Sequence, residues 1–343
     1  MTTDTTAPAE AARTGGTPPG TLRRGDRVRV RPAAEILAGL DANGDLDGLP
    51  FMPEMLPLCG GEMVVQSRAD KTCDTVNLLG CNRRMTGTVH LVGARCDGSA
   101  HGGCQAGCLL FVKEEWLERT APAREPAHPV PAPAEAVSAL RRAAEPAPGT
   151  YRCQATQLLA ATTPMPRGDL VQYIQDVRTG NAPARKAART FAYAVLNHYQ
   201  RWSKRLPSAL RVNDGDPLPR VRGRLDKTPR ERLDLQPGEL VEVRSREEIE
   251  ATLDRSLRNR GLSFDVEMTR WCGRRARVLR RVERIVDEAS GRMLELPNDC
   301  IVLEGVACEG DYHRLCPRQV YAYWREIWLR RVDEPAAGAR SVR

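Results

Sequence analysis

One stretch of this sequence occurs twice without a gap. It reads GDRVRVRPAAEILAGLDANGDLDGLPFMPEMLPLCGGEMVVQSR at residues 25–68 and GELVEVRSREEIEATLDRSLRNRGLSFDVEMTRWCGRRARVLRR at residues 238–281, with 18 of 44 positions identical. After a slip of one residue, residues 89–119 repeat in the same way as residues 301–331. Such a repeat indicates two copies of one domain, near residues 21–120 and 235–333.

Each copy predicts a mainly β domain. Alternating apolar residues predict strands at 26–30 and 239–243, and each strand follows a glycine turn. Helices are expected at 33–41 and 245–254, because the apolar residues of the first of these share one helical face. Further short strands are expected; they lie at 86–92, 108–112, 300–306 and 320–324. The pattern predicts an α+β chain of two small, partly open, SH3-like β-barrels with metal-stabilised loops.

Two unlike segments separate the copies. Residues 121–149 are rich in Pro and Ala, which predicts a linker. Residues 150–234 predict a helical bridge, within which residues 178–232 hold 14 Lys and Arg against 4 Asp and Glu, a net charge of +10. We also expect a disordered N-terminus at 1–20 and a flexible tail at 334–343.

The composition excludes an integral membrane protein. Hydrophobic residues make up 41% and charged residues 28% of the 343 positions, and no apolar run reaches the length of a membrane span. Because residues 1–20 lack the features of an export signal, we expect a cytoplasmic protein with no membrane partner. The 11 cysteines are then expected to be reduced thiols.

Four potential metal ligands recur in register in the two copies. They are Cys59 with Cys272, Cys96 with Cys308, His101 with His313, and Cys104 with Cys316. A local Cys-x4-His-x2-Cys loop joined by a remote cysteine predicts a structural zinc site in each copy. Packing of buried cysteines is the alternative, and in the second copy Cys300 is an alternative ligand to His313.

The first copy alone adds Cys73, Cys81, His90 and Cys108. Its six cysteines exceed what one zinc ion takes, and small residues surround Cys96 and Cys104, as around iron–sulfur clusters. We therefore expect an iron–sulfur cluster of the 4Fe-4S type here, or a metal with a reactive thiol pair able to carry a persulfide. The candidate cluster ligands are Cys59, Cys73, Cys96, Cys104 and Cys108. The second copy is expected to hold zinc or a second cluster.

Four stretches resemble an uncharacterised bacterial family of duplicated cysteine-rich proteins. They are LPFMPEM from residue 49, CDGSAHGGCQAGCLLF from 96, YRCQAT from 151 and NDCIVLEGVAC from 298. The resemblance spans residues 21–333 and implies that Cys153 belongs to the ligand set. It implies no activity and no catalytic residue.

Two functional hypotheses follow. The first is a metal- or iron–sulfur-dependent enzyme of a bacterial biosynthetic pathway, with redox or sulfur-transfer chemistry on a small-molecule or carrier-bound substrate. The thiol surplus makes the first copy the candidate active domain, with Cys73, Cys108 and Glu54 as candidate catalytic residues. The second is a non-catalytic, zinc-stapled module that binds nucleic acid or an acidic partner through residues 178–232.

Overall fold

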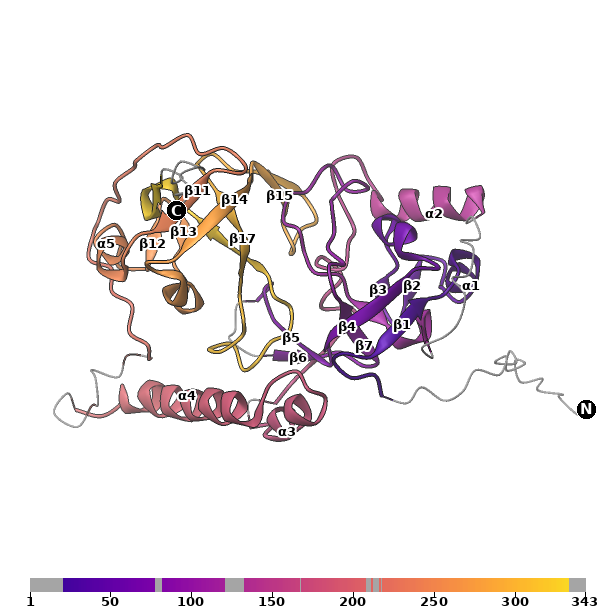
Figure 1. Ribbon diagram of the computed structural model, residues 1–343, viewed down its shortest axis with the longest axis horizontal. Coiled ribbons are helices and arrows are strands. Elements are labelled where there is room, and N and C mark those ends of the chain that lie inside the picture. Colours follow the sequence, from indigo (N-terminus) through magenta and orange to yellow (C-terminus); the bar gives the residue numbers. More distant parts are fainter. Residues whose placement is uncertain are drawn as a thin grey trace, which may run out of the picture.

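The computed structural model describes residues 21–77, 82–120, 133–166, 168–207, 211, 216 and 218–332. The predicted disordered N-terminus, the predicted tail and Cys81 lie outside these residues. The described chain is mixed, with antiparallel sheets and few helices, and Figure 1 shows its two β-rich halves side by side.

The first half is built on a five-stranded sheet in the order β8-β7-β4-β1-β9. Its strands are β1 (Arg27–Val30), β4 (Glu62–Arg68), β7 (Thr88–Leu91), β8 (Val112–Lys113) and β9 (Leu117–Arg119). All pairings are antiparallel. The apolar side chains of β1 face a core in which Phe51 meets Trp116 edge to face at 5.2 Å.

The second half repeats this sheet in the order β18-β17-β14-β11-β19. Its strands are β11 (Leu240–Val243), β14 (Arg275–Arg281), β17 (Ile301–Ala307), β18 (Tyr321–Trp324) and β19 (Leu329–Arg331). Equivalent residues pair: Val28 lies opposite Met63, and Val241 opposite Ala276. The duplication is therefore present as one strand order and register, while the SH3-like assignment stays a prediction.

Short helices and hairpins connect the strands in the same places. They are α1 (Ala33–Ala38), α5 (Arg246–Glu250), the hairpins β2 (Asp45–Leu46) with β3 (Leu49–Pro50) and β12 (Arg258–Asn259) with β13 (Leu262–Ser263), and the 3-10 helices η1 (Pro53–Leu58), η2 (Glu114–Trp116), η5 (Val266–Trp271) and η6 (Glu326–Trp328). Both α-helices lie where they were predicted but are shorter. A capping box between Ser245 and Glu248 starts α5.

Each half also extends an arm toward the other half. The first arm pairs β5 (Lys71–Cys73) with β6 (Asn82–Arg84), which β10 (Thr163–Pro164) extends, and the second pairs β15 (Arg284–Val286) with β16 (Met293–Glu295). The backbone N–H of Cys73 donates to Cys316 Sγ of the second half, and that of Val286 donates to Cys104 Sγ of the first. Since Cys73 and Val286 are equivalent positions, 213 residues apart, the halves exchange equivalent strands.

Arginines hold the junction between the halves. Arg95 donates to the carbonyl oxygens of Gly107 at 2.8 Å and Gln319 at 3.0 Å, which are equivalent positions of the two repeats. Arg318, which is 2% exposed, binds Thr75 and Glu288, again an equivalent pair. The two repeats are thus arranged with approximate two-fold symmetry.

Three helices lie between the repeats in the sequence: α2 (Ala134–Ala144), α3 (Val171–Arg178) and α4 (Ala184–Ser203). The segment predicted as a linker contains α2, whose Leu140 packs into the first core. The predicted helical bridge contains α3 and α4, which lie along one edge of the molecule.

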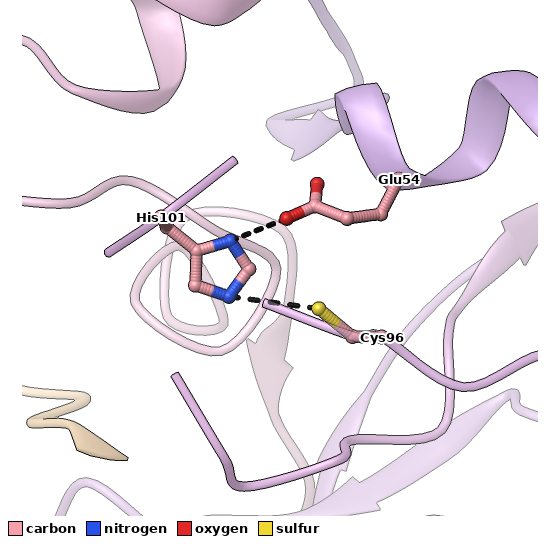
Figure 2. A group of neighbouring side chains, drawn as sticks. All are labelled: Glu54, Cys96 and His101. Carbon is pink, nitrogen blue, oxygen red and sulfur yellow. Dashed lines mark hydrogen bonds and ion pairs between the residues drawn. The ribbon is translucent and has the colours of Figure 1, made fainter. Parts of the chain in front are cut away.

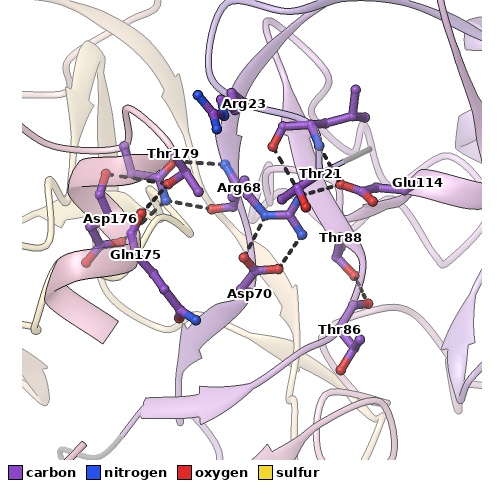
Figure 3. A network of polar contacts seen from close by, with 12 residues as sticks. Thr21, Arg23, Arg68, Asp70, Thr86, Thr88, Glu114, Gln175, Asp176 and Thr179 are labelled. Carbon is purple, nitrogen blue, oxygen red and sulfur yellow. Dashed lines mark hydrogen bonds and ion pairs between the residues drawn. The ribbon is translucent and has the colours of Figure 1, made fainter. Parts of the chain in front are cut away.

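Polar contacts fix the turn after α3 to the first sheet. The side-chain amide of Asn181 pairs with the backbone N–H and C=O of Arg68, at 2.8 and 3.0 Å. The guanidinium of Arg68 in turn binds Asp70 and Glu114, as Figure 3 shows. The bridge is therefore anchored to the first half through one buried arginine.

Candidate metal centres

The two Cys-x4-His-x2-Cys loops have one backbone conformation. Cys96 N–H donates to Cys108 O at 2.8 Å, and at the equivalent positions Cys308 N–H donates to Val320 O at 2.9 Å. Within each loop the histidine N–H donates to the carbonyl of a glycine three residues earlier. Three matching positions have left-handed φ values, and they are glycines in the first repeat (Gly102, Gly103, Gly107) and Arg314, Leu315 and Gln319 in the second.

Both loops have a glycine at the same position, Gly98 and Gly310, because the backbone there passes close to the rest of the loop. A Cβ on Gly98 would lie 2.1 Å from Cys104 O, and one on Gly310 would lie 2.7 Å from the backbone of Cys316. Both glycines also have positive φ. The loop therefore folds back on itself and brings its histidine and its two cysteines together in both repeats.

In the first repeat, donor atoms of Glu54, Cys96 and His101 all lie within 4.8 Å of one another, as Figure 2 shows. His101 Nδ1 lies 2.7 Å from Glu54 Oε1, and His101 Nε2 lies 3.5 Å from Cys96 Sγ. The same Glu54 oxygen accepts the backbone N–H of Ala100 at 2.9 Å. One ring nitrogen thus faces a carboxylate while the other faces sulfur.

Two further thiols complete this group. Cys104 hydrogen-bonds to His101, and Cys153, from the segment after α2, lines the same cavity of about 40 Å³. Burial opposes the charged ring, but the hydrogen bonds to Cys104, Cys96 and Glu54 raise the pKa of His101. Three thiols and one imidazole therefore surround a small enclosed space.

In the second repeat, the equivalent residues Glu267, Cys308 and His313 converge within 4.8 Å. Glu267 Oε1 accepts the backbone N–H of Tyr312 at 2.6 Å, as Glu54 does from Ala100. Cys316 lies beside this group, and its sulfur accepts the backbone N–H of Cys73. The first repeat therefore contributes a backbone donor to the sulfur beside the second group.

The two centres differ in which carboxylate holds the imidazole. In the second centre Asp265 Oδ1 lies 3.1 Å from His313 Nε2, and the position equivalent to Asp265 in the first repeat is Met52. Against the effect of burial, Asp265 raises the pKa of His313 to about 9. The histidine partner in the second repeat is thus a residue that the first repeat lacks.

Because Asp265 pairs with His313, Glu267 does not hold the histidine of its centre as Glu54 holds His101. Burial raises the pKa of Glu267, whereas the hydrogen bond to His101 lowers the pKa of Glu54 against the effect of burial. Glu267 is 4% exposed, and its Oε2, like Oε2 of Glu54, has no hydrogen-bond partner among the described residues. A buried oxygen without a partner is costly and is a natural site for a proton or a ligand.

The surroundings of the two centres also differ in volume. The second centre lies on a cavity of about 560 Å³, walled by η5, the loop carrying His313, β18 and α4. Its aromatic and polar lining includes Tyr193, Asn197, Trp271, Tyr312 and Tyr323. Small-molecule sites in proteins commonly have this size, so the second centre has room for a substrate beside it.

The structure brings together most of the predicted ligands. Cys96 and His101 converge in the first centre, where Cys104 hydrogen-bonds to His101, and Cys308 and His313 converge in the second, where Cys316 interacts with Cys308. Cys153, which the resemblance added, joins the first centre. Cys108 lines the first cavity as well, where burial raises the pKa of its thiol to about 12.

Other predicted residues lie elsewhere. Cys73 belongs to the second centre, because β5 carries it across the junction. Cys59 and Cys272 end η1 and η5 and are not members of the two converging groups; Cys272 instead lies near charged residues of α5. Cys300 packs with Val282 and Val302 at the start of β17.

Sequence reasoning missed Asp265. The available signal was the pair of positions two residues before the shared glutamate, where one repeat has a carboxylate and the other has methionine. Among the residues that the structure describes, no helix combines the length and apolar character needed to span a bilayer. Comparisons with protein-family models, with curated proteins and with solved structures found no match to this chain.

Proposed function

We propose that this protein is a zinc-dependent enzyme whose reaction centre lies in the second repeat, while the first centre is a structural zinc site. The observation that carries the proposal is the position of Glu267, a buried carboxylate beside Cys308 and His313 on the wall of the 560 Å³ cavity. The sequence had assigned the chemistry to the first repeat, because cysteines are more numerous there. The larger cavity and the carboxyl group of Glu267 favour the second repeat as the place of the chemistry.

The first centre has the composition of a closed zinc site. Cys96, Cys104 and Cys153 supply three thiolates and His101 supplies Nε2, which fills four tetrahedral positions. Glu54 holds the other ring nitrogen, as a carboxylate does behind most metal-bound histidines. Four protein ligands leave no position for a substrate, so this centre stabilises the loop.

The donor types in the first centre favour a single ion. Its cavity of about 40 Å³ is far smaller than the cavity of about 560 Å³ at the second centre. The imidazole of His101 also suits zinc better than an all-thiolate cluster.

In the second centre we assign Cys308, His313 and Cys316 as ligands, which leaves a fourth position toward the cavity. Zinc held by three protein ligands supplies a Lewis acid and lowers the pKa of a bound water. Asp265 orients the ring of His313. Glu267, whose pKa is raised by burial, is the group that takes and returns the proton as general base.

The chemistry supported is therefore metal-assisted proton transfer or hydrolysis of a small molecule. Cys73 lies on the cavity wall beside Cys316, as a thiol that is not a ligand in this assignment. Zinc has no redox chemistry of its own, so the redox class expected from the thiol surplus is not favoured by this centre.

Zinc analysis of cysteine variants tests the open position. The wild type should carry two zinc ions per chain, Cys308→Ala and Cys316→Ala should each carry one, and Cys73→Ala should still carry two. In the cobalt-substituted wild type, thiocyanate should change the visible spectrum of one ion by taking the open position. A zinc ion lost from Cys73→Ala, together with a cobalt spectrum indifferent to thiocyanate, would make the second centre a closed Cys3His site and end the enzyme proposal.

A second candidate is iron–sulfur or sulfur-transfer chemistry in the first repeat. One observation favours it, namely that four thiols line the first cavity; they are those of Cys96, Cys104, Cys108 and Cys153. Anaerobic purification with a visible spectrum and analysis of iron, acid-labile sulfide and zinc separates the two candidates. We expect a colourless protein with zinc, and brown protein containing iron and sulfide would establish the alternative.

A further inference from the structure

Exposed apolar side chains are concentrated on α3 and α4. Of the twelve large hydrophobic residues that are exposed among the described residues, eight lie on these two helices or next to them. We call this set the α3–α4 face; it consists of Leu170, Val171, Ile174, Val177, Phe191, Val195, Tyr199 and Trp202. Contiguous exposed apolar surface in a folded protein marks an interaction site.

The eight side chains form one surface. Phe191, Val195, Tyr199 and Trp202 recur every three or four residues and therefore lie on one side of α4. Tyr173 joins the two helices, because its ring meets that of Phe191 edge to face at 5.5 Å. Other residues of α4 line the cavity of the second centre. The α3–α4 face thus points outward, along the edge of the molecule seen in Figure 1.

The α4 part of this face carries cations, one of which, Lys204, pairs with Asp216. Residues 184–205 contain six Lys and Arg and neither Asp nor Glu. Lys186 and Arg189 reach Asp311 of the second repeat, while Arg185 and Arg205 are exposed. The surface therefore combines exposed aliphatic and aromatic side chains with positive charge.

We propose that the α3–α4 face docks on an anionic membrane surface. A basic amphipathic helix with aromatic residues on its apolar side lies in the plane of the lipid interface, inserting that side and setting its cations against acidic headgroups. Tyr199 and Trp202 are of the type that favours the headgroup region. The sequence predicted no membrane partner because no segment is long enough to span a bilayer, but docking of an exposed face requires no spanning segment.

The observations favour this occupant over two others. Leu170, Ile174 and Val195 have no flat ring on which a base can stack, so a single-stranded nucleic acid would leave them in water. A second copy of the chain would bring two acid-free cationic segments against each other, which is unfavourable. An anionic lipid surface accepts both the apolar side chains and the charge.

Vesicle cosedimentation of the full-length, zinc-loaded protein tests the proposal. The wild type should bind vesicles of phosphatidylcholine with phosphatidylserine, bind pure phosphatidylcholine vesicles weakly, and lose affinity as salt is raised. Ile174→Gln/Val195→Gln should reduce binding by roughly tenfold or more, because two side chains no longer insert. The matched control, Val92→Gln/Leu294→Gln, replaces two exposed apolar residues outside the face and should bind as the wild type does.

Each outcome bears on the proposal. Zinc content and circular dichroism of both double variants should equal those of the wild type, since all four side chains are 44% exposed or more. Equal vesicle binding by the wild type and Ile174→Gln/Val195→Gln, or no binding by either, would overturn the proposal. Two other results would also overturn it. One is a wild-type dimer in sedimentation experiments, and the other is binding of the wild type to single-stranded DNA, if only Ile174→Gln/Val195→Gln abolishes it. The face would then bind a second copy of the chain or a nucleic acid.

Discussion

The sulfur of Cys316 in the second repeat accepts a 3.1 Å hydrogen bond from the backbone N–H of Cys73 in the first. The equivalent bond runs the other way, from Val286 N–H to Cys104 Sγ at 3.3 Å. Hydrogen bonds of this kind stabilise thiolate ligands. Each metal loop is therefore completed by the arm of the other repeat, and neither repeat is self-sufficient.

The carboxylates that hold the two histidines should matter for metal affinity, whereas Glu267 should not. Glu54→Gln should weaken zinc binding at the first centre by roughly 10- to 100-fold, and Asp265→Asn should do the same at the second, because each holds a metal-bound imidazole. Glu267→Gln should leave zinc affinity at the second centre nearly unchanged. Competition with a chromophoric zinc chelator measures all three. An affinity loss in Glu267→Gln as large as in Asp265→Asn would contradict the separate role of Glu267.

Substitution of the two cysteines that end the 3-10 helices should not remove metal. Cys59→Ser and Cys272→Ser should each retain two zinc ions per chain, because neither sulfur belongs to a converging donor group. Metal analysis after gel filtration measures this, with Cys104→Ser as the variant expected to lose one ion. One zinc ion lost from Cys59→Ser would restore the ligand set expected from the sequence.

The buried ion pair between Lys71 and Asp176 should be essential to the junction. Their charged atoms lie 2.6 Å apart with both side chains 4% exposed, and Lys71 Nζ also donates to Arg314 O of the second loop at 2.7 Å. Lys71→Met should destabilise the protein by about 3–5 kcal/mol, because Asp176 is left as an uncompensated buried charge. Denaturant unfolding in excess zinc measures the loss.

The double variant Lys71→Met/Asp176→Leu serves as the control for this pair. It should recover most of the stability, since replacing both charges with apolar groups removes the desolvation cost. If the double variant were as unstable as Lys71→Met, the contact of Lys71 with Arg314 would be the dominant one instead.

His90 should make the first half sensitive to acid. Burial lowers its pKa from 6.5 to about 4, and its Nδ1 hydrogen-bonds to Leu110 O at 2.8 Å. The unfolded chain therefore binds a proton at a pH where the folded chain does not. The stability is complete above pH 6.5 and falls as the pH drops toward about 4, by up to about 3 kcal/mol.

Thermal unfolding of the wild type and His90→Gln across this range measures the effect as a difference between the two proteins. The two curves should converge as the pH is lowered, because glutamine does not titrate. Metal loss at low pH affects both proteins and cancels in the comparison. Parallel curves from pH 7 to pH 4 would show that His90 is not buried in its neutral form.

Local patterns were sufficient to predict the elements of the repeats. Alternation predicted β1 and β11, and the apolar face of residues 33–41 predicted α1, because these signals depend on neighbours a few residues away. The paired Cys-x4-His-x2-Cys loops place one cysteine beside the histidine in each copy, Cys96 with His101 and Cys308 with His313. The bounds of the helices were less accurate, since their ends are set by packing on the sheets.

The remote ligands could not be predicted in the same way. The alignment favoured Cys59 and Cys272, because they recur in both copies. In the structure, Cys153 lines the first cavity and Cys73 lines the second, and neither has an equivalent in the other copy. Cys73 reaches the second centre because the arm that carries it packs against the other repeat.

By itself the sequence determined the duplication, several strands of each copy and the loop that holds two cysteines and a histidine, since each is encoded in contiguous residues. The strand expected at 108–112 is shorter and lies at Val112–Lys113. Only the tertiary structure decided that β5 packs against the second repeat and that Asp265, not Glu267, pairs with His313. It also decided that the larger cavity lies beside the second centre. These features depend on how the two halves and α4 pack together. Contacts between residues more than two hundred positions apart leave no periodicity in the chain.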